Sequence, residues 1–170
     1  MLDYTIDYQK LNRFAKKVSK QKCFDDEVKE IISKYFQIPI DDFEEEKGLL
    51  KLNSYFYYLP VYLGMKKSEN FDLHCVFSNP EKNVLLRWWI NYVAKVGEDE
   101  RERVVLVFKK NYQPILCLLL LTTYKDLLSG NFSRFYVKTV ITFESEQAGE
   151  IFVICKFEDL LLERKKRINV

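Results

Sequence analysis

The sequence predicts an α/β fold, a single domain in which helices flank a mixed central sheet. One segment with helical periodicity, residues 82–97, passes directly into two continuous apolar segments of strand length, Val104 to Phe108 and Ile115 to Leu121. The chain has 13 Phe and 11 Tyr but only five Gly, a composition that favours aromatic-rich sheets over flexible loops. At 170 residues it is long enough to bury one core, so we expect residues 1–170 to form one domain.

The helix of residues 82–97 and the strand pair after it form the predicted centre of the fold. Apolar side chains recur at i, i+4, i+7 and i+11, which is the spacing of one face of an amphipathic helix; they are Leu85, Trp89, Tyr92 and Val96. Gly97 and a polar run over residues 98–103 end this helix. A turn over residues 109–114 then joins the two strands.

The remaining elements are predicted from periodicity and from turn residues. We expect helices at residues 8–18, 23–36, 124–128 and 157–164, and strands at residues 49–59, 61–65, 71–77, 134–143 and 150–155. In residues 71–77 apolar side chains alternate with others, which predicts a strand beside Val104 to Phe108 in the sheet centre. Residues 37–47 include an acidic run, Asp41 to Glu46, and we expect a solvated, mobile loop there.

The charge pattern restricts where nucleic acid could bind. The formal net charge is only +2, so any basic footprint must be local. The strongest cluster has no acid between Tyr8 and Phe24, and it consists of Lys10, Arg13, Lys16, Lys17, Lys20 and Lys22. Contact with DNA phosphates is one interpretation of this cluster, and a solvated helix face is the other.

The cysteines and the hydropathy favour a cytoplasmic protein that does not enter a membrane. Cys23, Cys75, Cys117 and Cys155 occur singly, without the paired spacing of a metal site and without a secretory signal upstream. We expect them to be reduced thiols in the core. The longest apolar run, Ile115 to Leu121, is far too short to cross a bilayer.

Two blocks of the sequence resemble nucleases of the PD-(D/E)xK superfamily, in particular the phage-encoded Holliday-junction-resolvase-like nucleases. The downstream block begins with a double tryptophan in a helix, Trp88 and Trp89, and an amide two positions on, Asn91. An apolar strand at residues 104–108, a basic pair, Lys109 and Lys110, and a strand led by Pro114 follow. In the upstream block, residues 20–36, an acidic residue follows a phenylalanine, and that residue is Asp25. The resemblance covers about residues 20–130, outside the C-terminal strand pair and short helix at 131–164. It implies a restriction-endonuclease-like core and an origin in a phage or mobile element.

The same resemblance implies what catalysis would need. Such nucleases hold Mg²⁺ with an acidic cluster that includes an Asp at the start of the second strand and a Glu-x-Lys on the third, whose lysine supports the nucleophile. When residues 71–77 are aligned with that third strand, His74 replaces the Glu and Val76 replaces the Lys. The strands from Leu49 to Met65 contain no acid. We therefore expect an inactive relative without a metal site or cofactor, with Asp25, Asp72 and His74 as vestigial site residues.

Three functions follow from these patterns. The leading hypothesis is a catalytically inactive nuclease-like module that binds DNA or a protein partner, with the basic N-terminal cluster, Lys109 and Lys110 contacting DNA. The second is an active Mg²⁺-dependent DNA endonuclease whose ligands have migrated to Asp25, Asp72 and the Asp41 to Glu46 run. The third is a small structural or inhibitor protein that binds other proteins. For Trp88 and Trp89, a place in the core is favoured over a partner surface.

Overall fold

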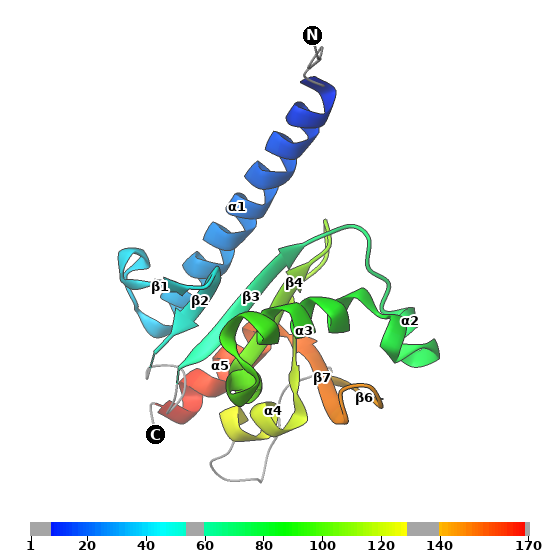
Figure 1. Cartoon of the computed structure of the whole chain (residues 1–170). Helices are drawn as coiled ribbons and strands as arrows, with labels where there is room; N and C mark the ends of the chain where they lie inside the picture. The colour runs from blue at the N-terminus through cyan, green and yellow to red at the C-terminus, as the bar shows by residue number, and fades with distance from the viewer. Residues whose placement is uncertain (1–7, 54–59, 129–139, 169–170) are drawn as a thin grey trace.

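A computed structural model describes residues 8–53, 60–128 and 140–168, which form a seven-stranded mixed sheet between layers of helices (Figure 1). The sheet order is β1-β2-β3-β4-β5-β7-β6. The strands are β1 Glu44–Glu46, β2 Leu49–Leu52, β3 Val61–Lys67, β4 Val104–Lys109, β5 Leu116–Leu120, β6 Val140–Ser145 and β7 Glu150–Lys156. The α-helices are α1 Tyr8–Phe36, α2 His74–Ser78, α3 Val84–Val96, α4 Leu121–Leu128 and α5 Phe157–Ile168, and three short 3-10 helices are η1 Ile40–Asp42, η2 Pro80–Lys82 and η3 Glu98–Arg103. The predicted α/β fold with a mixed sheet is confirmed.

The connection through α3 explains why the sheet is mixed. β3 and β4 are parallel, and α3 provides the crossover that a parallel pair requires, whereas every other neighbouring pair is antiparallel. β4 is the middle strand of the seven, and its residues Val104 to Phe108 are all buried. The prediction that this segment lies at the sheet centre is therefore confirmed.

Alternate residues of the central strands supply two separate hydrophobic layers. One layer contains Leu63 and Val105 and is covered by the second half of α1 together with α4 and α5. The other contains Leu106 and is covered mainly by α3, through Trp89 and Val93. Figure 1 shows the corresponding arrangement, with α3 across one face of the sheet and α5 behind the other. The sheet is thus covered by helices on both faces.

The two N-terminal helices predicted at residues 8–18 and 23–36 form one continuous helix, α1. The segment contains neither Gly nor Pro, so no residue interrupts the backbone hydrogen bonds between the two predicted parts. The second part has a buried face, made by Phe24, Val28 and Ile32, whereas residues 13–20 of the first part are exposed. The first part extends away from the sheet (Figure 1).

The strand predicted at residues 71–77 is wrong. The carboxylate of Asp72 accepts a hydrogen bond from the backbone N–H of His74 over 2.9 Å, and this local turn directly precedes the short helix α2. Phe71 and Val76 are buried but Phe77 is exposed, so the alternation in the sequence does not correspond to the two faces of a strand. The local turn at Asp72 therefore overrides the period-2 pattern, and β3 is the neighbour of β4.

The mobile loop predicted at residues 37–47 is also wrong, because it contains η1 and the edge strand β1. Lys47 and Gly48 both have positive φ, 55° and 75°, as the two central residues of a type I′ hairpin turn require. This turn pairs Glu46 with Leu49. The three glutamates of β1 place charge on the exposed edge of the sheet, which disfavours pairing with another chain.

Several other elements have shifted bounds. The strand predicted at 49–59 is β2 over its first residues, and residues 54–59 lie outside the described part of the chain. The strand predicted at 134–143 is observed at β6, and residues 134–139 also lie outside the description. The predicted burial of the cysteines is correct for two of them: Cys117 and Cys155 are buried, Cys75 is half-buried and Cys23 is exposed.

Candidate nucleic-acid interface

A cleft of about 540 Å³ lies between the exposed half of α1 and the end of the sheet. One wall is α1, the other includes α3, and between them lie the end of β3, the segment after it and the turn between β4 and β5. Four lysines and one glutamate make its charge strongly positive. The lining residues are Phe14, Lys17, Val18, Lys20, Gln21, Lys66, Lys67, Ser68, Glu69, Asn70, Trp88 and Asn111.

The α1 wall divides the predicted basic cluster into two groups. Phe14, Lys17, Val18 and Gln21 recur at helical spacing and line the cleft, together with Lys20. The other described members of the cluster are exposed on α1 without lining the cleft, namely Arg13, Lys16 and Lys22. Lys10 lies in the first turn of α1, and its side chain is outside the described part of the structure.

Two lysines that the sequence analysis did not select, Lys66 and Lys67, lie at the end of β3. Both are half-buried and both line the cleft. Among the described residues neither ammonium group forms a salt bridge, so their charge is available to a ligand. The signal in the sequence is a lysine pair directly after an apolar strand segment, but only the fold brings this pair opposite α1.

The amide of Gln21 fixes α1 against the free edge of β3. Nε2 donates to the carbonyl oxygen of Met65 over 3.2 Å, while Oε1 accepts from the backbone N–H of Lys67 over 3.1 Å. β2 pairs with β3 only as far as Leu63, so this one side chain occupies the position of a strand neighbour. The hydroxyl of Tyr92 also donates to the Met65 carbonyl, over 3.0 Å. These bonds hold the α1 wall and the lysines of β3 in a fixed relation.

The two tryptophans of α3 have different environments. Trp89 is buried, its indole N–H donates to the carbonyl of Val104 over 3.0 Å, and its ring meets Phe152 edge-on. Trp88 is half-buried, packs edge-on against Phe71 and lines the cleft. The expectation that this pair belongs to the core is therefore correct for Trp89 and incomplete for Trp88.

The three vestigial site residues are not gathered at one point. Asp25 lies on α1 next to Gln21, whose Nε2 donates to it over 2.6 Å, whereas Asp72 and His74 are exposed at the start of α2. In the described ranges no group of three or more His, Cys, Asp or Glu side chains is placed to hold a metal ion. Burial raises the pKa of Asp25, and the hydrogen bond from Gln21 opposes this rise.

Lys109 and Lys110, predicted to contact DNA, lie beside the cleft at the end of β4. The ammonium group of Lys109 forms an ion pair with Glu27 of α1 at 2.5 Å, which satisfies its charge within the protein. Lys110 is half-buried and precedes Asn111, a lining residue of the cleft. Of the two, Lys110 is the better candidate for a phosphate contact.

The acidic run, Asp41 to Glu46, contacts α1 beyond the basic cluster. Glu45 of β1 forms an ion pair with Lys29 of α1 at 2.7 Å, and Glu46 pairs with Lys51 of β2 at 2.8 Å. The described side chains of the basic cluster, all exposed, occupy residues 13–22 of the same helix. Positive and negative groups are therefore separated along α1.

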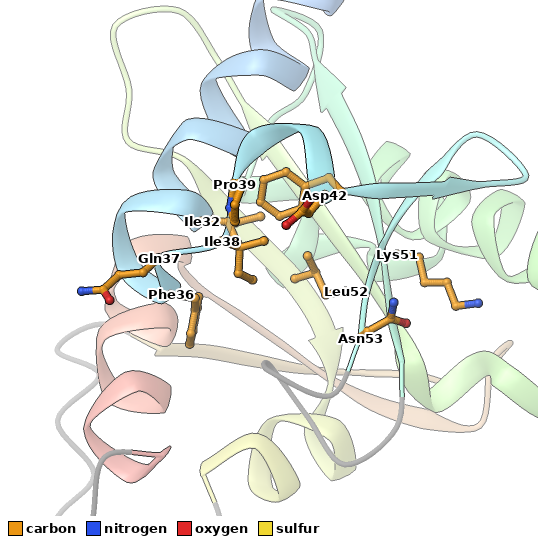
Figure 2. A pocket seen from close by; sticks show the side chains of 10 residues that line it. Ile32, Phe36, Gln37, Ile38, Pro39, Asp42, Lys51, Leu52 and Asn53 are labelled. Carbon is orange, nitrogen blue, oxygen red and sulfur yellow. The ribbon is translucent and has the colours of Figure 1, made fainter.

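A smaller hollow of about 170 Å³ lies where α1 ends, among η1 and β2 (Figure 2). Ile38 and Leu52 lie in its middle, while Gln37 and Lys51 extend outward at its sides. Its lining is mainly apolar, and its two charged residues, Asp42 and Lys51, form no convergent acid-base pair among the described hydrogen bonds. The larger, basic cleft is therefore the stronger candidate for a functional site.

No protein-family model, curated protein or solved structure matches this chain. In the described residues no helix has the length and apolar character needed to span a membrane.

Proposed function

We propose that this protein is a catalytically inactive, nuclease-like module that binds DNA through the basic cleft and the exposed half of α1. The observation that carries this proposal is that lysines from α1 and lysines from the end of β3, far apart in the sequence, line one cleft. Lysine ammonium groups attract phosphates, and each phosphate contact releases counterions from the nucleic acid. The free cysteines are consistent with a reducing compartment, so we further propose that the module acts in the cytoplasm.

The separation of charge supports a defined orientation on DNA. With a net charge of +2, the whole molecule is attracted to a polyanion only weakly. The acidic strand β1 lies beside Lys29, whereas the exposed basic stretch ends at Lys22. A polyanion is therefore attracted to the N-terminal half of α1 rather than to the β1 edge, so the cleft faces the DNA.

The order of elements supports the nuclease-like part of the proposal. The order in the sequence is one helix, three strands, a crossover helix and two further strands. These elements are α1, β1 to β3, α3, β4 and β5. The third strand of this series is Val61–Lys67, not the predicted residues 71–77. β2 and β3 contain no acid, although the resemblance requires an Asp and a Glu there. Lysines are present at the end of β3, but without those acids they have no metal-bound water to support.

We predict that the protein does not cleave DNA. Linear, supercoiled and branched DNA should remain intact in buffers with MgCl₂ or MnCl₂, because the described residues include no group of three or more His, Cys, Asp or Glu side chains placed to hold a metal ion. Gel electrophoresis over a time course measures this. Asp25→Ala and Asp72→Ala are the controls. Metal-dependent cleavage that disappears in either variant would establish the active endonuclease instead.

We predict that DNA binding weakens steeply with salt and that the exposed lysines of α1 cause this dependence. Changing Lys16, Lys17, Lys20 and Lys22 to Gln should reduce the slope of log K against log salt by about three to four if all four contact phosphates. Fluorescence anisotropy of a labelled oligonucleotide, titrated at several NaCl concentrations, measures the slope. The matched control replaces four exposed lysines outside the basic cluster, Lys34, Lys82, Lys125 and Lys156, and should leave the slope nearly unchanged.

Two outcomes would contradict DNA binding through the exposed half of α1. One is no detectable binding at low salt, and the other is the same slope in the α1 variant and in wild type. In either case the basic helix is a solvated face, and binding of a protein partner becomes the leading hypothesis.

A further inference from the structure

We propose that the cleft is selective for single-stranded nucleic acid, with Phe14 and Trp88 as stacking surfaces for unpaired bases and the four lysines as phosphate contacts. This inference depends on the proposed function, because it specifies which form of nucleic acid the basic surface binds. It rests on side chains that the general charge argument does not use.

The first supporting observation is an exposed aromatic residue on the α1 wall. Phe14 is 68% exposed although it lies on a helix, and it faces a cleft rather than the core. Val18, one helical turn further on, is also exposed and lines the same cleft. Neighbouring exposed apolar side chains beside a cleft form a patch of the kind that marks a binding groove.

The second observation is an aromatic residue on the opposite wall. The ring of Trp88 meets the ring of Phe71 at 81° with centroids 6.4 Å apart, and Phe71 in turn meets Phe108 of β4 edge-on. These contacts hold the indole in place while part of it borders the cleft. A ring that is already immobilised loses little entropy when a base stacks on it.

The combination of rings and lysines distinguishes single strands from duplexes. In a duplex each base face is covered by its neighbours, so an aromatic side chain can stack only on bases that are unpaired. Lys17 and Lys20 on one side and Lys66 and Lys67 on the other provide cations beside such bases. A volume of about 540 Å³ is in the range of pockets that enclose small molecules, and it fits individual bases rather than a double helix.

The deciding experiment compares two variants of equally exposed phenylalanines. Phe14→Ala should weaken binding of a fluorescein-labelled oligothymidylate by about 5- to 150-fold, the range expected for one lost base stack, and should leave binding of a duplex of equal length nearly unchanged. Phe77→Ala is the matched control, because Phe77 is 70% exposed on α2 and does not line the cleft. It should leave both affinities unchanged. Both side chains are exposed, so both variants should fold, and circular dichroism checks this.

A second measurement uses the tryptophan in the cleft. Oligothymidylate should quench the intrinsic fluorescence of the wild type, because a base that stacks on an indole quenches it. In Trp88→Phe this quenching should disappear while binding, followed by anisotropy, persists. Trp89 is buried in the core and should contribute little to the quenching.

The outcomes separate this inference from the proposed function. Salt-dependent binding of both DNA forms, with the same affinities in Phe14→Ala and Phe77→Ala, would overturn single-strand selectivity and leave DNA binding intact. No binding of either form at low salt would overturn both. Preferential loss of single-strand binding in Phe14→Ala, together with quenching through Trp88, is the supporting result.

Discussion

Replacing Gly64 by alanine is expected to lower the free energy of unfolding by about 3 kcal/mol, because a side chain at this position has no space. A Cβ atom on Gly64 would lie 2.2 Å from Cδ2 and 2.4 Å from Cε2 of Tyr92. The ring cannot move aside easily, since its hydroxyl donates to the Met65 carbonyl and its centroid lies 5.2 Å from Nζ of Lys95. Chemical denaturation followed by circular dichroism measures the loss.

The matching control removes the Tyr92 ring that causes the clash. Tyr92→Leu should itself destabilise the protein, since it removes the ring and the hydrogen bond to Met65. In that background the further cost of Gly64→Ala should fall by at least half, because the two positions are in direct contact and their effects are not additive. A Gly64→Ala variant as stable as the wild type would show that α3 does not pack on β3 as described.

The centre of the fold was predictable because its signals are local and strong. The continuous apolar run of β4 and the helical period of α3 follow each other in the sequence, and the structure places them in contact. In residues 71–77 such local signals are not sufficient. Their alternation matches a strand, but the hydrogen bond from the His74 N–H to the Asp72 carboxylate favours a helical turn, and a short apolar segment does not reveal which effect is stronger.

The cleft could be predicted only in part. The positive charges of α1 are visible in the sequence, because no acid interrupts them. The opposite wall is not visible in the sequence, since it depends on two hydrogen bonds between Gln21 and β3. Their partners, Met65 and Lys67, follow Gln21 by 44 and 46 positions. Lys66, Lys67 and Trp88 join the site through this tertiary contact. Their roles depend on where the end of β3 and the first half of α3 lie in space, which periodicity does not encode.

The adjacent tryptophans of α3 should differ sharply when each is changed to alanine. Trp89→Ala is expected to lower the free energy of unfolding by about 4 kcal/mol, because it removes a buried ring, its contact with Phe152 and its hydrogen bond to Val104. Trp88→Ala is expected to cost about 1 kcal/mol, the value of its edge-on contact with Phe71.

Urea unfolding of both variants measures this difference. It is followed by circular dichroism, so that the loss of an indole does not alter the signal itself. Each variant is the control for the other, since both remove the same side chain from the same helix. Equal losses would mean that Trp88 is as deeply packed as Trp89, and the cleft would then lack the aromatic wall on which single-strand binding depends. A small loss for Trp88, combined with weaker binding of oligothymidylate, would instead identify a side chain whose main contribution is to the cleft and not to the core.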